Sequence, residues 1–195
     1  MASIARLSVF ASAAFVMGAG PADDGRWFAG GFSFSDELGG FRILEIRGSG
    51  TKADPVVLTK ELYSASEVIL VIRQDGPRPP SMAADRPGTA LYLQLETVNG
   101  SELAWVEFSY ELQMHLGQPS VYGDGLSFDQ AQAEDGTISA DAFTSFSRDF
   151  EPYDRLLFRD GKVDPKETAT FSMLITDLTP TYQFYLVADP RIPFS

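Results

Sequence analysis

A row of side chains suited to sugar binding alternates with apolar residues between Glu102 and Leu116. The members of this row are Trp105, Glu107, Ser109, Glu111, Gln113 and His115. In an extended strand they share one face, about 7 Å apart, because each residue rises ~3.3 Å. Such a row could bind an extended polysaccharide. The Trp105 ring would stack on a sugar, and the Glu and Gln side chains would form hydrogen bonds with the sugar hydroxyls. An ordinary solvated sheet face has the same pattern, and a one-residue bulge would move Trp105 into the core between two sheets.

The two carboxylates of this row do not form a catalytic pair. Glu107 and Glu111 are four residues apart, roughly 13 Å along a strand, whereas glycosidase carboxylates stand about 5–9.5 Å apart. A hydrolase would need a carboxylate from a neighbouring strand, such as Glu96. His115 is the only histidine, and Ser109 lies roughly 20 Å from it along the strand, too far for a Ser–His–Asp arrangement. We therefore expect no catalytic residues.

Calcium is the metal ion that the sequence favours. Asp160, Asp164 and Glu167 fall in one expected loop, and carboxylate oxygens are the donors that calcium prefers. Their spacing does not match the twelve-residue calcium loop of helix–loop–helix proteins. The chain contains no cysteine, which excludes disulfides, cysteine nucleophiles and iron–sulfur clusters. We therefore expect no cofactor, with a structural calcium ion as the alternative.

Exposed aromatic residues are the other candidates for a binding surface, because tryptophan and tyrosine are favoured among the residues that dominate interfaces. Besides Trp105, these candidates are Trp27, Tyr122 and Tyr153. Trp27 belongs to the apolar segment Arg-Trp-Phe-Ala-Gly-Gly-Phe. We expect this segment to dock either on its own domain or on a neighbouring subunit by strand addition.

The elements that must position these residues are strands. Val68–Ile72 is apolar and β-branched on both faces, which is typical of a central strand. Asn99-Gly100 separates the alternating run Leu91–Leu95 from the run 102–116, and this dipeptide predicts a hairpin between them. The other expected strands are 41–47, 55–59, 155–159, 169–175 and 182–186, with short fragments around Phe128 and 143–146.

These strands predict an all-β fold. With 195 residues, 44% of them hydrophobic, the chain can bury a sizeable core. Many short strands separated by turns predict a single antiparallel β-sandwich over residues 23–195, either immunoglobulin-like or a jelly roll. The segments 74–88 and 117–152 are richer in Gly, Pro, Ser and Asp, and we expect irregular loops there.

The first 22 residues predict a cleaved signal peptide. Arg6 precedes the uncharged run Leu7–Gly20, and Pro21-Ala22 follow before Asp23-Asp24. A basic start, a short apolar run and small residues before the mature chain are the features of an export signal. Fourteen residues are too few for a helix that spans the hydrocarbon core, which takes about 20. We expect cleavage after Ala22 and a mature chain without a transmembrane segment.

A segment near the end of the chain resembles a sequence pattern found in exported immunoglobulin-like sandwich domains of bacteria. It runs from Leu157 to Asp177 and reads LFRDGKVDPKETATFSMLITD. In those domains a strand ending in Gly-x-Val turns through Pro and an acidic residue into an alternating strand. It is also similar to segments of proteins sorted by a C-terminal Pro-Glu-Pro anchor, but the apolar helix and basic tail of that anchor do not follow. The resemblance implies a fold and no catalytic residue.

These observations favour an exported, noncatalytic protein that works by surface contact. A net charge of -12 argues against nucleic acid and anionic lipid as partners, because both require clustered Lys and Arg. The absence of cysteine suits a bacterial periplasm or the cell exterior. We expect a structural, adhesive or accessory module whose partner is an envelope or extracellular protein assembly, or a surface polysaccharide. The alternative is a carbohydrate-binding module or a small jelly-roll glycoside hydrolase.

Overall fold

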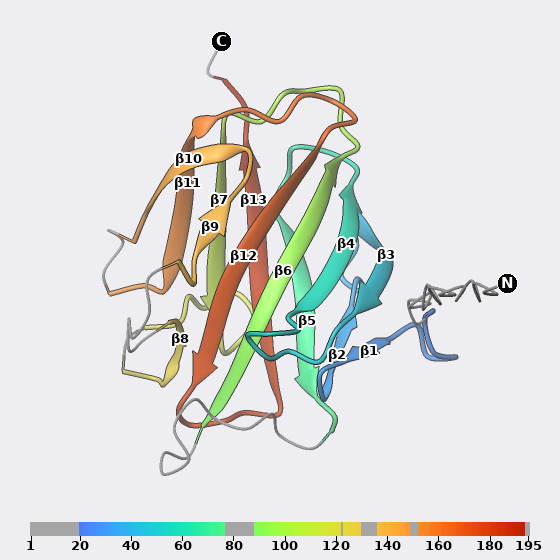
Figure 1. Ribbon diagram of the computed structural model, residues 1–195, viewed down its shortest axis with the longest axis vertical. Helices are drawn as coiled ribbons and strands as arrows, with labels where there is room; N and C mark the ends of the chain where they lie inside the picture. Colours follow the sequence, from blue (N-terminus) through green and yellow to red (C-terminus); the bar gives the residue numbers. More distant parts are fainter. Residues whose placement is uncertain (1–19, 77–87, 122, 130–135, 149–151, 194–195) are drawn as a thin grey trace, which may run out of the picture.

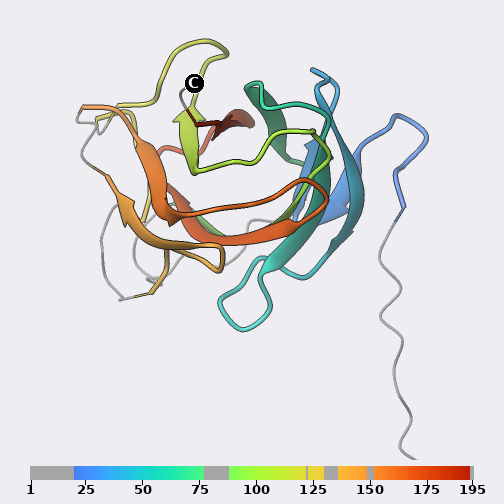
Figure 2. The ribbon, with the colours of Figure 1, turned by 90° about the horizontal axis from the view of Figure 1, so that it is seen from above.

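Two β-sheets pack face to face in the computed structural model (Figure 1). It describes residues 20–76, 88–121, 123–129, 136–148 and 152–193. These residues form thirteen strands and no helix, which confirms the predicted β-sandwich. Seen from above, the sheets form two curved layers (Figure 2). Within the described residues, no helix is long and apolar enough to cross a membrane.

The larger sheet has seven strands, and every pair of neighbours in it is antiparallel. In spatial order these are β1 (Trp27–Ala29), β2 (Phe32–Ser35), β5 (Val68–Gln74), β13 (Gln183–Arg191), β7 (Glu107–Gln113), β11 (Arg155–Gly161) and β10 (Phe143–Ser147). The last strand of the chain, β13, therefore lies between β5 and β7 near the middle of the sheet. Val68–Ile72, predicted to be central, forms most of β5, and Leu70 and Val71 are both buried although they face opposite sides.

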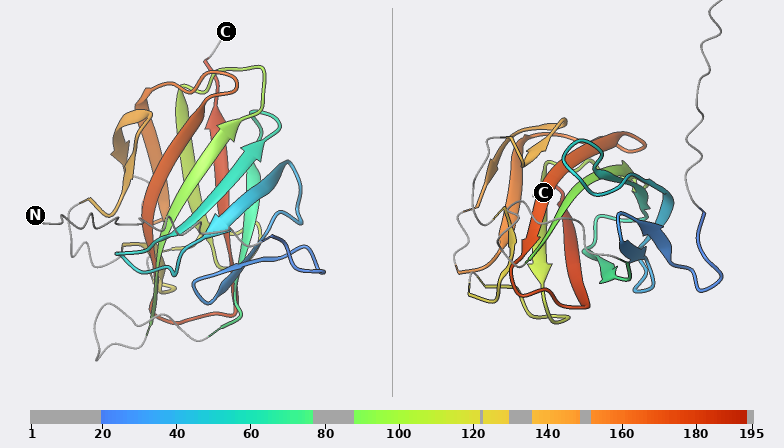
Figure 3. Two further views of the ribbon diagram at one scale, coloured as in Figure 1. Left: turned by 45° about the vertical axis from the view of Figure 1, so that its right-hand side comes forward. Right: turned by 60° about the horizontal axis from the view of Figure 1, so that its bottom comes forward.

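The second sheet has six strands. In spatial order these are β3 (Phe41–Arg47), β4 (Val56–Leu62), β6 (Thr89–Asn99), β12 (Thr168–Asp177) and β8 (Leu126–Phe128), while β9 (Ser139–Ala140) also pairs with β12. Figure 3 shows β3, β4, β6 and β12 side by side. The pair β4 and β6 is parallel, unlike the antiparallel sheet that was predicted. The reason is the connection: β5 crosses to the other sheet between them, so the chain returns to start β6 in the direction of β4.

Aromatic side chains fill much of the space between the sheets. Phe171 on β12 lies at the centre, with ring centroids of Phe108, Tyr110 and Phe158 at 4.7, 5.1 and 5.1 Å. These rings come from both sheets and meet edge-on or tilted, the arrangements that aromatic quadrupoles favour. Alternation along each strand sends these residues inward and their neighbours outward.

The predicted hairpin at Asn99-Gly100 is wrong. Strand β6 belongs to the six-stranded sheet and β7 to the seven-stranded sheet, so this segment carries the chain from one sheet to the other. The Asn99 side chain is buried and donates to the carbonyls of Leu103 and Val163, at 2.9 and 3.1 Å. Its amide oxygen accepts from the Ser101 backbone N–H at 3.0 Å. Asparagine here stabilises a corner rather than a two-residue turn.

The two segments expected to be irregular differ in the structure. Residues 117–152 contain the short strands β8, β9 and β10, in agreement with the predicted fragments around Phe128 and 143–146. In the first segment, β5 ends at Gln74 and β6 begins at Thr89, and residues 77–87 lie outside the described residues. Most of the predicted signal peptide also lies outside them, since the description starts at Gly20.

Candidate functional site

The polar row predicted for residues 105–115 is present only along β7. Phe108, Tyr110 and Leu112 point into the core, so the alternate residues Glu107, Ser109, Glu111 and Gln113 face outward from the seven-stranded sheet. The strand ends at Gln113, and His115 lies beyond it in a turn closed by Gln118. The row is therefore four residues long and lies between β13 and β11.

Trp105 does not belong to this row. Its side chain is 0% exposed and packs edge-on against Phe108, with ring centroids 5.4 Å apart. Its backbone pairs with Val163 outside the named strands, and Val106 separates it from the start of β7. This break shifts the alternation, and Trp105 turns into the core. The prediction that its ring forms a sugar platform is wrong, and the inter-sheet alternative describes its position.

Glu111 is the most enclosed acid of the row. Its carboxylate accepts hydrogen bonds from the Arg155 guanidinium, including one of 2.8 Å from Nε, and from the Gln113 amide at 2.8 Å. Gln113 in turn accepts from the Gly117 backbone N–H at 2.7 Å. These bonds compensate the burial of the carboxylate. The network therefore fixes Glu111 as part of the sheet surface rather than leaving it to act on a ligand.

Glu67 lies close to the same row, just before β5. Burial raises the pKa of its carboxyl, and the negative charges of Asp189 and Glu111 raise it further, while Arg155 opposes the rise. Like charges gathered on one surface disfavour the ionised form. This acidic group comes from three elements, and Glu107 is not among the acids that perturb the Glu67 carboxyl.

Glu107 lines an open hollow at the end of the seven-stranded sheet, together with Asp160. The hollow has a volume of about 730 Å³ and also includes Arg159 and Arg191. Both arginines have partners on the protein: Arg191 lies 3.6 Å from Glu107, and Arg159 donates to the Ser147 hydroxyl at 2.9 Å. The structure thus brings two predicted site residues to one hollow whose positive charges already have partners.

The two aromatic residues of β1, the candidate Trp27 and its neighbour Phe28, lie on opposite faces of the strand. Trp27 is 9% exposed and belongs to the core, so its predicted exposure is wrong, and the segment docks on its own domain through pairing of β1 with β2. Successive strand residues point to opposite faces, and Phe28 is accordingly 44% exposed. Trp27 anchors the strand that presents Phe28.

Phe28 and Tyr182 are exposed, and together with the partly buried side chains of Arg26 and Asp75 they form a group that we name the corner patch. The Arg26 guanidinium lies 5.3 Å from the centroid of the Phe28 ring and 3.0 Å from the Asp75 carboxylate. The Tyr182 hydroxyl donates to Asp75 at 3.0 Å, and its side chain is 61% exposed. Hydrogen bonds from the Ser33 and Tyr182 hydroxyls and the charge of Arg26 lower the pKa of Asp75, which keeps its carboxylate ionised.

Of the remaining aromatic candidates, Tyr153 is 45% exposed, and its backbone forms a bridge with Val121. Tyr122 lies outside the described residues.

The carboxylates predicted to bind calcium have separate contacts. Asp160 accepts a hydrogen bond from the Ser145 hydroxyl at 2.5 Å, Asp164 lies 2.7 Å from the Lys162 amine, and Glu167 accepts from the Asp164 backbone N–H at 2.9 Å. Among the residues that the structure describes, no three acidic or histidine side chains lie close enough to hold a metal ion.

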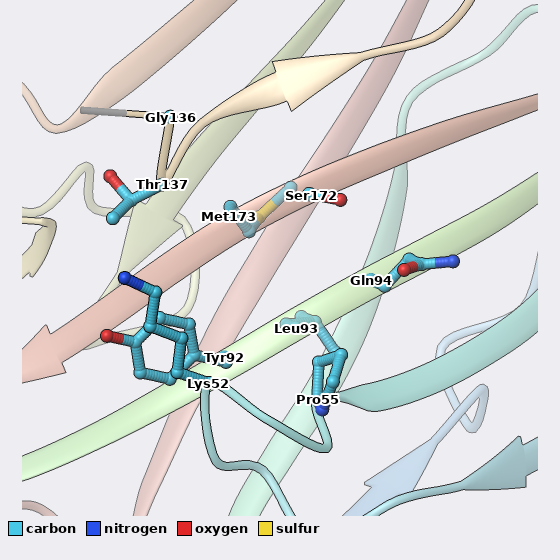
Figure 4. Close-up of a pocket in the computed structure, with 9 residues that line it drawn as sticks. All are labelled: Lys52, Pro55, Tyr92, Leu93, Gln94, Gly136, Thr137, Ser172 and Met173. Carbon is cyan, nitrogen blue, oxygen red and sulfur yellow. The ribbon is translucent and has the colours of Figure 1, made fainter. Parts of the chain in front are cut away.

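A second hollow lies on the outer face of the six-stranded sheet (Figure 4). Its volume is about 220 Å³, and its lining residues are Lys52, Pro55, Tyr92, Leu93, Gln94, Gly136, Thr137, Ser172 and Met173. Tyr92 and Gln94 are alternate residues of β6, so both face outward, and Gln94 pairs in register with Ser172 of β12. In Figure 4, Lys52, Tyr92 and Thr137 gather at one end and Gln94 and Ser172 at the other. The hollow offers an aromatic ring, an amide and hydroxyls.

A wholly buried amine lies inside the sandwich. Lys60 points inward from β4, with its Nζ atom 5.5 Å from the ring centroids of both Phe41 and Tyr110. Within the described residues, this Nζ has no hydrogen-bond partner. Burial lowers its pKa to about 7. Since the side chain is 0% exposed, we assign it to the core and not to a site.

Local sequence patterns did not reveal the corner patch or the second hollow. Phe28 had a usable signal, because in a strand an inward Trp27 implies an outward Phe28. No sequence signal pointed to Tyr182 and Asp75, because their proximity depends on the pairing of β5 with β13. Lys52 and Thr137 lie in loops that are distant from Tyr92 in the sequence. No local sequence pattern therefore predicts that the three residues line one hollow.

Comparisons with models of protein families, with curated proteins and with solved structures found no match to this chain.

Proposed function

We propose that this protein is exported and acts without catalysis, by surface contact, as a structural or accessory subunit of an envelope or extracellular assembly. The corner patch is the observation that carries the proposal. It combines arginine and two exposed aromatic rings, the residue types enriched where interface energy concentrates. The first residues of the sequence support export through their signal-peptide pattern.

The patch adjoins an edge strand. Among the described strands, β1 pairs only with β2 and ends the seven-stranded sheet. An edge strand offers backbone N–H and C=O groups to an added strand. The partner is therefore an extended segment of another protein subunit, which pairs with β1 and places apolar side chains on Phe28 and Tyr182.

Site-specific crosslinking in the producing cells tests this proposal. A photo-reactive amino acid at position 28 is expected to capture one protein in stoichiometric amount, and a probe at Phe146 is not. Phe146 is a matched control, since it is 42% exposed and lies on β10 at the opposite edge of the sheet. The sequence of the recovered amino terminus tests export, with a start at Asp23 expected.

Substitutions separate contact from folding. With the probe kept at position 28, Arg26→Ala and Tyr182→Ala are expected to abolish the crosslinked complex, whereas Tyr63→Ala, at another exposed tyrosine, is expected to preserve it. All variants should keep the melting temperature of the unmodified chain within a few degrees. Equal capture from positions 28 and 146, or a complex that persists in both patch variants, would overturn the proposal.

A further inference from the structure

The hollow of Figure 4 has the composition of a sugar site. Sugar rings present an apolar face of C–H groups and a rim of hydroxyls, so a protein holds them with an aromatic ring and with side chains that both donate and accept hydrogen bonds. Tyr92 supplies the ring, and the amide of Gln94 both donates and accepts. Thr137 and Ser172 line the same hollow. The Thr137 hydroxyl donates to the Asp129 carboxylate, so toward a sugar it can only accept.

Two of these groups stand on a strand that is paired on both sides. Tyr92 and Gln94 stand on β6, which pairs with β4 on one side and with β12 on the other. Gln94 faces Val57 of β4 and Ser172 of β12 in register. Groups on a central strand keep their spacing without a cost of ordering at the moment of binding.

The volume and the charge of the hollow restrict the class of ligand that it can bind. A volume of about 220 Å³ is below the roughly 300–1,000 Å³ of pockets that enclose drug-sized molecules, and it suits one sugar ring. Eight of the nine lining residues are uncharged, and the exception is Lys52. The chain as a whole carries a net charge of -12, which repels acidic polymers.

We infer that this hollow binds one ring of a neutral polysaccharide, with Tyr92 against a face of the sugar and Gln94, Ser172 and Thr137 bonded to its hydroxyls. Lys52 flanks the ring at the Tyr92 end. The inference goes beyond the proposed subunit contact, because the hollow and the corner patch lie on different sheets. Each assignment therefore has its own test.

Titration calorimetry of the full chain with neutral trisaccharides (cellotriose, maltotriose, mannotriose and galactotriose) tests the inference, with trigalacturonate as the acidic probe. We expect at least one neutral trisaccharide to bind and trigalacturonate to bind more weakly. Tyr92→Ala should weaken binding roughly tenfold, the loss expected when an aromatic contact is removed. Tyr92→Phe retains the ring and should remain within about twofold of the unmodified chain, since the ring carries the stacking.

Further variants locate the site. Gln94→Ala should weaken binding about fivefold or more through lost hydrogen bonds, and Tyr182→Ala on the other sheet should leave it unchanged. Thermal melting of each variant identifies any loss of fold. The inference is overturned if none of the four neutral sugars binds at about 10 mM, a concentration above the weakest useful affinities. Binding that Tyr92→Ala and Gln94→Ala leave intact, or a preference for trigalacturonate, also overturns it.

Discussion

At the scale of single residues, Lys60 is a buried amine that has no hydrogen-bond partner among the described residues. Its Nζ lies between two aromatic rings, each 5.5 Å away, where a cation gains some energy from the ring quadrupoles. That gain does not replace hydration, because the residue is completely buried. Its pKa, about 7 against an ordinary value of 10.5, reflects this desolvation. The buried lysine therefore lowers the free energy of unfolding of the protein.

This cost predicts a specific pH dependence. Between pH 7 and 10.5 the unfolded chain holds the Lys60 proton and the native state does not, so stability rises with pH in this window. Below pH 7 the native state also holds this proton, so the full cost of burying a charged amine is present. Lys60→Met removes it, and at about 1.4 kcal/mol for each unit of pKa shift the variant should be more stable at pH 7 by a few kcal/mol.

Urea denaturation at pH 7, 8.5 and 10 measures the effect. The variant is expected to lose most of the rise with pH that the unmodified chain shows. The same slope in both proteins would mean that the Lys60 amine titrates normally and is accessible to water.

Trp105 leads to a second prediction at this scale. Its ring is fully buried against Phe108, so Trp105→Ala should lower the free energy of unfolding by about 3–5 kcal/mol, the usual cost of removing a large core aromatic. Trp105→Phe, which leaves a smaller cavity, should cost less. Urea denaturation compares the two, and a loss below 1 kcal/mol in Trp105→Ala would place the ring at the surface instead.

At the scale of elements, local patterns predict strands well and their partners poorly. Period-two alternation over 102–116 predicted β7, and β-branched residues predicted most of β5, because each signal depends only on which faces are buried. The partner of a strand depends on contacts distant in sequence. Asn99-Gly100 illustrates this, since the same dipeptide that favours a hairpin closes a corner between sheets when Asn99 finds buried backbone partners.

The candidate sites show the same limit. Glu107 and Glu111 lie on the same face of β7, as alternation along one strand predicted, although Glu111 is buried there. The corner patch unites Arg26, Asp75 and Tyr182 through three separate elements. The hollow over β6 depends on the parallel pairing of β4 with β6. Sites assembled from several elements follow the topology, which alternation does not specify.

The corner at Asn99 provides the prediction for this scale. Asn99→Ala would leave the Ser101 backbone N–H and hydroxyl without their shared acceptor. The buried carbonyl of Val163 would lose its side-chain donor and keep only the Trp105 backbone N–H. Each unsatisfied buried group costs about 1–3 kcal/mol, so we expect a loss of roughly 2–4 kcal/mol in urea denaturation. Asn99→Asp retains the acceptor and lacks the donors, and should also destabilise the protein. An unchanged midpoint in Asn99→Ala would show that other bonds hold the corner.

At the scale of the whole molecule, the order of the strands makes the larger sheet depend on the end of the chain. Strand β13 pairs with β5 over six residues and with β7 over seven, and it joins the β1–β2–β5 part of the sheet to the β7–β11–β10 part. Pro190 is tolerated in this central strand because the pairing with β5 ends at Ala188. The missing N–H of Pro190 therefore removes no hydrogen bond to β5. Many such long-range pairings predict slow folding that is completed only when β13 is present.

Truncation tests this dependence. Removal of residues 183–195 takes Phe184, Leu186 and Ala188 out of the core and leaves β5 and β7 as unpaired edges. We expect that chain to lack a cooperative thermal transition by near-ultraviolet circular dichroism and to be cleaved rapidly by protease. Removal of residues 192–195 alone keeps β13 complete and should shift the melting temperature by only a few degrees. A cooperative transition in the longer truncation would show that the two halves of the sheet fold without the strand that joins them.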